Sequence, residues 1–130
     1  MFKAGGHLYV YFSYGMHYAI NIVTGPAGRG EAVLLRAAEP LEGIEIMRRN
    51  RHLTDMKKLA AGPGRLAQAL GITDTSLSGK ILDQSSIYLE SPLYAVEPKD
   101  IIASPRIGIT KNPDPLWRFY IKANPFVSKL

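Results

Sequence analysis

Apolar and aromatic positions gather near the start of the chain, over residues 7–23. Residues 8–12 are rich in β-branched and aromatic side chains, as strands prefer, and residues 18–23 form a second stretch of the same character. Gly15 lies between the two stretches, and a glycine adopts the positive φ of a tight turn without strain. The pattern therefore predicts a β-hairpin over residues 7–23.

The rest of the chain shows further strand-like runs and two stretches typical of helices. Strands are predicted over residues 31–37, 85–89, 101–109 and 118–122. Helices are predicted over residues 40–52 and 62–70. Because the strands gather early and late instead of alternating with helices, the expected class is α+β. We expect one mixed domain over residues 1–130, with an antiparallel-rich curved sheet, a protruding β-hairpin and flanking helices.

Composition narrows the choice of function class. Apolar residues make up 46% of the 130 residues and charged residues 21%, which is typical of a folded domain with its own core. The absence of cysteine excludes disulfides, thiolate zinc sites and cysteine nucleophiles. The sequence shows neither an apolar run of membrane-spanning length nor a signal peptide, so we expect a cytoplasmic location and no membrane partner.

Charge adds a candidate partner. The net charge of +5 and the pI near 9.6 favour a polyanion, with nucleic acid first, although many basic domains bind none. Six Lys and Arg residues lie between Ile44 and Arg65, against two acids. This cluster fits either a solvated helix face or a set of phosphate contacts. The Gly-Pro-Gly turn before Arg65 likewise fits either an ordinary helix start or an anion site.

Tyrosines are concentrated in the predicted hairpin. The four are Tyr9, Tyr11, Tyr14 and Tyr18. Alternating aromatic residues on a strand are usually packing residues, but a ring at a hairpin tip can also part a base stack, and rings in a pocket can hold an extruded base. The three histidines lack metal-ligand spacing, and a nucleophile motif is not visible. The residues alone thus indicate a basic α+β domain with a tyrosine-rich hairpin and a candidate phosphate site.

Five blocks of sequence, in order, resemble the alkyladenine (3-methyladenine) DNA glycosylases. They are HLYVYFSYGMHYAINI (7–22), AVLLRAAEPLEG (32–43), GPGRLAQALGI (62–72), PRIGI (105–109) and RFYIKANPFVS (118–128). The resemblance implies a base-excision-repair hydrolase that flips an alkylated or deaminated purine out of double-stranded DNA and cleaves its N-glycosidic bond. It also implies a monomer that needs neither metal nor cofactor and, in a bacterial cell, is associated with the nucleoid.

The resemblance assigns five residues to the flipped base and the attacking water. Tyr11 would stack on the base, Asn21 would crowd the exocyclic amino group of guanine, and Leu34 would line the pocket. Arg36 and the backbone carbonyl of Ile107 would hold the hydrolytic water.

Five further residues are assigned to the DNA duplex. Tyr14 would be the wedge that fills the gap left by the flipped nucleotide, with Met16 and His17 beside it in the minor groove. Arg51 and Arg65 would contact phosphates.

One part of the family pattern is missing. In the family the general base is a glutamate in a Glu-Ala-Tyr-like stretch before the hairpin, together with a Tyr and a His of the base pocket, whereas this sequence starts just ahead of the hairpin. We therefore expect DNA binding without useful excision. The acid nearest to Arg36 along the chain, Glu39, is expected to cap or pack locally. We also expect apolar surface and a strand edge left uncovered around the tyrosine-rich hairpin to favour self-association.

Three functions follow from these expectations. The first is a DNA glycosylase of the 3-methyladenine type. The alternative is a catalytically inactive DNA-binding remnant of that family. The third is a structural domain or an RNA binder that uses the same basic face.

Overall fold

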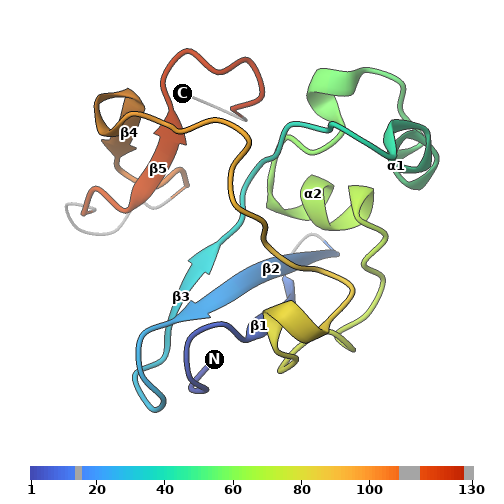
Figure 1. The fold of residues 1–130 in the computed structure, drawn as a ribbon. Helices are drawn as coiled ribbons and strands as arrows, with labels where there is room; N and C mark the ends of the chain where they lie inside the picture. The colour runs from blue at the N-terminus through green and yellow to red at the C-terminus, as the bar shows by residue number, and fades with distance from the viewer. Residues whose placement is uncertain (14–15, 109–114, 128–130) are drawn as a thin grey trace.

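The computed structural model describes residues 1–13, 16–108 and 115–127. It holds a three-stranded sheet, a helical region beside that sheet and a separate two-stranded sheet (Figure 1). The strands of the larger sheet are β1 (Leu8–Ser13), β2 (His17–Thr24) and β3 (Glu31–Leu34), all antiparallel in the order β1-β2-β3. The predicted hairpin is therefore confirmed, and the predicted third strand is present but ends three residues early.

One face of the three-stranded sheet forms the core. Leu8 pairs with Ile22 and Val10 with Ile20, and directly paired residues point to the same side of an antiparallel sheet. These side chains pack against α2 (Pro63–Ala69) and the segment that follows it. The predicted second helix is confirmed, with proline at its first position, where the missing N–H leaves no bond unmade.

The outer edge of β1 is not left open. The backbone N–H of Leu8 donates to the carbonyl of Lys80 at 2.9 Å, and Leu82 N–H donates to Gly6 at 2.8 Å. Gly79 N–H donates back to Leu8 at 2.7 Å. Residues 79–82 thus satisfy backbone groups that an exposed edge strand would offer to other chains, and η2 (Leu82–Gln84) continues from them.

The first helix is shorter than predicted. α1 runs over Ile44–Arg51, because Gly43 takes a left-handed conformation (φ 68°) as its N-cap and His52 takes one (φ 50°) as its C-cap. Asn50 Nδ2 donates to the carbonyl of Ala69 at 3.0 Å and so joins α1 to α2. A short 3-10 turn, η1 (Met56–Lys58), lies between the two helices.

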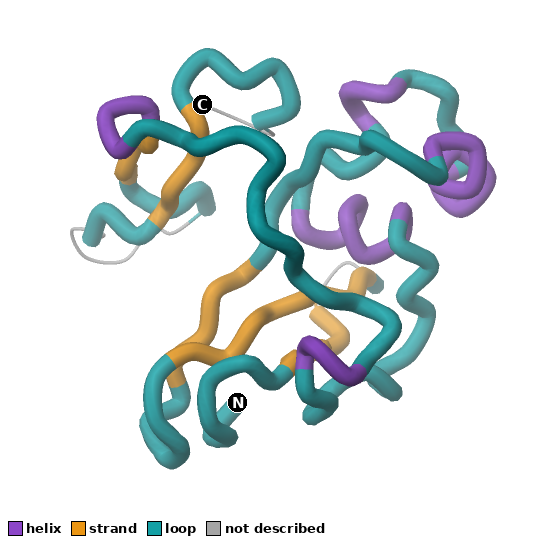
Figure 2. The backbone as a smooth tube through the Cα atoms, in the orientation of Figure 1, coloured by secondary structure: helices purple, strands orange, loops and turns teal. Residues whose placement is uncertain are grey.

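The predicted strand over residues 85–89 is wrong. The Ser85 hydroxyl donates to the carbonyl of Ile87 at 2.6 Å and accepts from the Ile87 N–H at 3.3 Å. These local bonds compete with the ladder that a strand needs. The stretch instead runs as a loop from η2 towards η3 (Pro98–Asp100) and the smaller sheet (Figure 2).

The smaller sheet pairs β4 (Ile101–Ser104) with β5 (Arg118–Ile121), antiparallel, with Ser104 opposite Arg118. β4 is shorter than predicted because Pro105 follows it and has no N–H for the ladder. The α+β class is confirmed, although the strands form two sheets.

The end of the hairpin lies close to the start of α2, and a substitution at a glycine of α2 tests this contact. A Cβ added at Gly64 would lie 2.6 Å from Cγ and 2.7 Å from Cβ of His17. Gly→Ala inside a helix normally stabilises by about 1 kcal/mol. We predict that Gly64→Ala instead lowers the free energy of unfolding by roughly 1–3 kcal/mol, because the backbones must separate.

The matched background is His17→Gly, which removes the ring and its Cβ. There, Gly64→Ala should be neutral or stabilising. Urea unfolding of the four proteins measures the coupling, and equal effects of Gly64→Ala in both backgrounds would contradict a direct contact.

Candidate functional site

A cavity of about 1010 Å³ is bounded by both sheets and by residues 35–39 and 124–127. It brings together all five residues that the sequence assigns to the base and the water. They are Tyr11, Asn21, Leu34, Arg36 and Ile107. The first four come from the three-stranded sheet and the residues just after β3, and the last lies beyond β4, so the fold brings together residues that are far apart in the sequence.

Sheet register explains why three of them meet. Asn21 pairs with Tyr9 across β1 and β2, and with Leu34 across β2 and β3. Tyr11 is two residues from Tyr9 and shares its face, which is opposite to the face that packs on α2. The alternation of the strands therefore assigns one face to the core and the other to the cavity.

Tyr11 and Asn21 are held by their neighbours on this face. The Tyr11 ring lies 5.3 Å from the Tyr9 ring, centroid to centroid, at a tilt of 37°. Asn21 is 7% exposed, and its Nδ2 donates to the carbonyl of Tyr9 at 3.2 Å. This hydrogen bond sets the orientation of the Asn21 amide relative to β1. The Asn21 side chain is therefore held in one position in the cavity wall.

Two arginines supply positive charge to the cavity. Among the described residues, the buried Nε of Arg36 has no hydrogen-bond acceptor. Arg118 is 6% exposed, and its Nη1 donates to the Ser104 hydroxyl at 3.3 Å while its guanidinium lies 4.6 Å from the Tyr120 ring centroid. Burial lowers the pKa of Arg36, and the nearby positive charge of Arg118 lowers it further.

Glu39 is the single acid in the described lining of the cavity, which also holds Arg106 besides Arg36 and Arg118. It is exposed and makes no hydrogen bond or ion pair with any described residue. The expected capping role is wrong, because α1 begins at Ile44 and its N-cap is Gly43, four residues beyond Glu39. Its carboxylate is therefore unsupported, and the formal charge of the described lining is positive.

The residues assigned to the minor groove lie at the turn that joins β1 to β2. Met16 is 82% exposed with φ 63°, and His17 is exposed and packs against Gly64. Tyr14, the assigned wedge, lies outside the described residues.

The two arginines assigned to phosphates differ in their surroundings. Arg51 donates from Nε to Leu59 O at 2.8 Å and from Nη1 to Gln68 Oε1 at 2.9 Å. Burial, and secondarily the charge of Arg65, lowers the pKa of Arg51. Arg65 is exposed, with one 3.2 Å bond to Ala61 O. Arg51 thus joins α1 to the segment before α2, while Arg65 presents its guanidinium to solvent.

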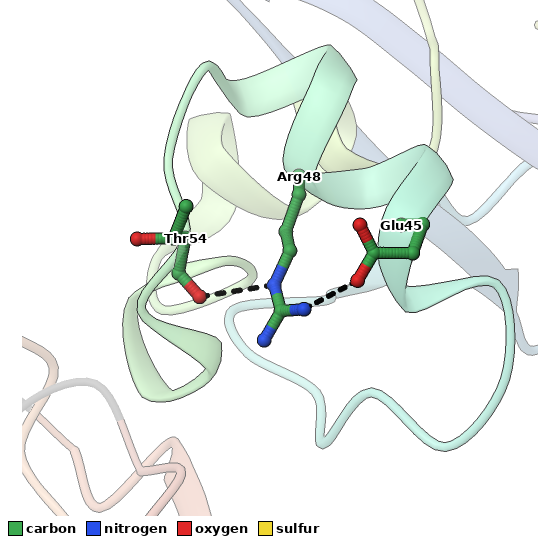
Figure 3. Close-up of polar contacts among 3 residues, drawn as sticks. All are labelled: Glu45, Arg48 and Thr54. Carbon is green, nitrogen blue, oxygen red and sulfur yellow. Dashed lines mark hydrogen bonds and ion pairs between the residues drawn. The ribbon is translucent and has the colours of Figure 1, made fainter.

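The rest of the basic cluster divides in the same way. Arg48 forms an ion pair with Glu45 and donates from Nε to Thr54 O at 3.0 Å (Figure 3). Arg49 and Lys57 are exposed. The structure therefore separates cations with internal partners from those that face solvent, which the sequence left open.

Sequence reasoning gave no role to Arg106, Trp117 or Arg118, which also line the cavity. The signal available was the Trp-Arg-Phe-Tyr run at 117–120, where a charge among aromatic residues is unusual for a strand. Within residues 1–13, 16–108 and 115–127, the structure holds no group of three metal-ligating side chains. None of the helices described is long and apolar enough to cross a membrane.

Comparison with known proteins gives a consistent result. Residues 1–125 match the family model described as methylpurine-DNA glycosylase. The chain is 46% identical over 129 residues to a protein of Nitrosospira multiformis, and 47% identical over 129 residues to one of Chlorobaculum tepidum. It is 48% identical over 130 residues to a protein of Francisella tularensis strain SCHU S4. All three carry the name "Putative 3-methyladenine DNA glycosylase".

These alignments cover 99% of the chain in each case. They cover 65% of the Nitrosospira protein, 61% of the Chlorobaculum protein and 67% of the Francisella protein. The chain therefore spans about two thirds of the length of the relatives it matches.

Proposed function

The chain belongs to the methylpurine-DNA glycosylase family, and we propose that it recognises alkylated or deaminated purines in double-stranded DNA as a base-excision-repair glycosylase of the 3-methyladenine type. The observation that carries the proposal is the meeting of Tyr11, Asn21, Leu34, Arg36 and Ile107 around one cavity. A purine inside a duplex is out of reach of such a cavity, so the nucleotide must be flipped out of the stack.

Within the cavity the base stacks on Tyr11, whose position the neighbouring Tyr9 ring supports. The buried Asn21 rejects an undamaged guanine, because its amide is fixed by the Tyr9 carbonyl and cannot turn away from an exocyclic amino group. Leu34, opposite Asn21 in the sheet, completes the wall.

Backbone contacts come from the face that carries the end of the hairpin and α2. Arg65 contacts phosphate directly, and Met16 and His17 flank Tyr14 as it fills the gap left by the base. In this proposal Arg51 acts indirectly, because its donors are engaged with Leu59 and Gln68. The substrate would be chromosomal DNA, so we propose a location at the bacterial nucleoid.

Hydrolysis needs a water molecule, a group to orient it and a base to accept its proton. Arg36 and the Ile107 carbonyl orient the water in this proposal, but a guanidinium stays protonated and cannot be the base. The single carboxylate in the described lining, Glu39, lacks the supporting hydrogen bonds that a positioned base has. This observation favours a second candidate function for the chain as printed: binding of damaged DNA without excision.

A matched pair of substitutions tests the DNA face. We predict a slope of roughly −3 to −6 in log K against log salt for duplex binding, at about −0.9 for each neutralised phosphate. Arg65→Met should make the slope less negative by about 1 and weaken binding to damaged and intact duplexes alike.

Arg51→Met removes the same charge and is the control. It should chiefly lower the free energy of unfolding, by about 1–3 kcal/mol, because it breaks three hydrogen bonds that join α1 to its neighbours. Fluorescence anisotropy titrations and urea unfolding separate the two effects. A slope near zero for the parent protein would show that it does not bind duplex DNA through phosphate contacts.

Excision is tested in single turnover, with protein in excess over a duplex that carries hypoxanthine, followed by alkaline cleavage. We predict no useful release of the base by the printed chain, because a positioned base contributes roughly 100- to 10,000-fold. Binding to an abasic duplex should be retained. Excision at the rate of a full-length relative, abolished by Glu39→Gln, would instead identify Glu39 as the base.

Self-association is expected from the sequence at the edge of the tyrosine-rich hairpin, but residues 79–82 bond to the first part of that edge. We propose it instead for an apolar face of the smaller sheet. Ile101 pairs with Ile121 on the two-stranded sheet, and Phe119 lies on the same face; all three are exposed, Phe119 by 65%. Apolar surface of this kind recruits other chains. We predict dimers or larger species in light scattering, shifted towards monomer by Phe119→Lys, and a monomer of high thermal stability in the parent protein would contradict this.

A further inference from the structure

Arg36 and Arg118 bring two positive charges to one cavity without an acid that pairs with them. Arg36 is half-buried, and its buried Nε has no acceptor among the described residues. Arg118 is 6% exposed and donates to a neutral group, the Ser104 hydroxyl, at 3.3 Å. Within the part of the chain that the structure describes, neither arginine forms an ion pair with a carboxylate. Guanidinium groups are rarely withdrawn from water in this way unless an anion compensates for their charge.

The two guanidinium groups also act on each other. Burial, and then the positive charge of Arg118, lowers the pKa of Arg36, so its protonated form is destabilised in the folded protein. The acid in the described lining, Glu39, is exposed and does not pair with either arginine. A charged side chain that is kept at the wall of a cavity against its own stability is typical of a group that binds a ligand.

A phosphate is the anion that best matches these donors. The N–H groups of a guanidinium form a planar fork that fits two phosphate oxygens. In the proposed function the nucleotide rotates out of the duplex about its own backbone, so the phosphates on either side of it move towards the cavity. An arginine in the cavity therefore reaches a phosphate only when a nucleotide is flipped, whereas the exposed Arg65 can contact one in any duplex.

We propose that Arg36, with Arg118 as a second positive charge, binds a phosphate that flanks the flipped nucleotide. This proposal rests on the proposed function, because it takes the cavity to be the pocket for the flipped base. Arg36 can hold the phosphate and the attacking water together, because a guanidinium carries several N–H donors. The negative charge of the phosphate also offsets the two arginines, so a purine made cationic by alkylation is not repelled.

Removal of one phosphate charge from the DNA tests the contact directly. A methylphosphonate has nearly the shape of a phosphodiester but carries no charge. Duplexes with hypoxanthine would carry it on the 5′ side or on the 3′ side of the lesion. We predict that one of these positions weakens binding of the parent protein by roughly 10- to 100-fold in fluorescence anisotropy titrations, as expected for a charge-assisted hydrogen bond. The same change in an undamaged duplex should have little effect, because no nucleotide is flipped there.

Arg36→Met is the matched change in the protein. It should weaken the hypoxanthine duplex by a similar factor, and the methylphosphonate should then have no further effect, because both changes remove one contact. In Arg65→Met, by contrast, the methylphosphonate should keep its full effect. Arg36→Met should unfold at the same or a higher urea concentration than the parent protein, because it removes a buried donor that has no internal acceptor.

Salt dependence gives a second measurement. Each neutralised phosphate contributes about −0.9 to the slope of log K against log salt, so the slope for the hypoxanthine duplex should be more negative than that for undamaged duplex by about this amount. Arg36→Met should remove the difference and leave the slope for undamaged duplex as it is. Arg65→Met should instead shift both slopes together.

The contact and the proposed function fail in different ways. If the parent protein binds hypoxanthine and abasic duplexes no better than undamaged duplex, the proposed function is wrong and the phosphate contact with it. If the lesion preference is present but neither flanking methylphosphonate weakens binding, or the loss is the same in Arg36→Met, Arg36 is not a phosphate ligand and the proposed function stands. A loss at one flanking position that Arg36→Met abolishes supports both.

Discussion

The antiparallel register of β1, β2 and β3 is the constraint on which the rest of the molecule depends. It pairs Leu8 with Ile22 on one face and Tyr9 with Asn21 on the other, so the same hairpin serves the core and the cavity. A slip of one residue would turn both sets to the wrong side. The register is secured by the packing of α2 on the core face and by residues 79–82 along the outer edge. The register therefore fixes the positions of Tyr11 and Asn21 on the face opposite to the core.

Electrostatics gives the cavity its chemical character. Arg36 and Arg118 are largely withdrawn from water, and the pKa of Arg36 falls because burial and a like charge both disfavour its protonated form. The Ser104 hydroxyl and the Tyr120 ring compensate for the loss of water around the Arg118 guanidinium. The buried Nε of Arg36, by contrast, has no acceptor among the described residues. Such a donor is suited to an oxygen of water or of an anion.

The basic cluster shows why charge counts alone do not locate an interface. Arg48 and Arg51 lie within four residues on α1, yet their donors serve Glu45, Thr54, Leu59 and Gln68, and so connect α1 to the segments beside it. Arg65, Arg49 and Lys57 face solvent. A guanidinium with several internal partners stabilises the fold, and an exposed one with a single bond, such as that of Arg65, is available to phosphate, even though both contribute equally to the net charge of +5.

The sequence by itself determined what depends on neighbouring residues: the hairpin from its β-branched and aromatic runs around Gly15, α2 from Pro63 and its apolar stripe, the α+β class, and the family from five ordered blocks. The predictions were wrong for elements that depend on competing local interactions. The Ser85 hydroxyl bonds to Ile87 in place of the strand hydrogen bonds predicted over residues 85–89, and α1 begins only after Gly43, four residues later than predicted. Tertiary structure alone decided that the strands form two sheets and that Arg106, Trp117 and Arg118 face Tyr11's cavity. The reason is physical: periodicity encodes which side of an element is apolar, whereas the meeting of residues about a hundred positions apart depends on how whole elements pack.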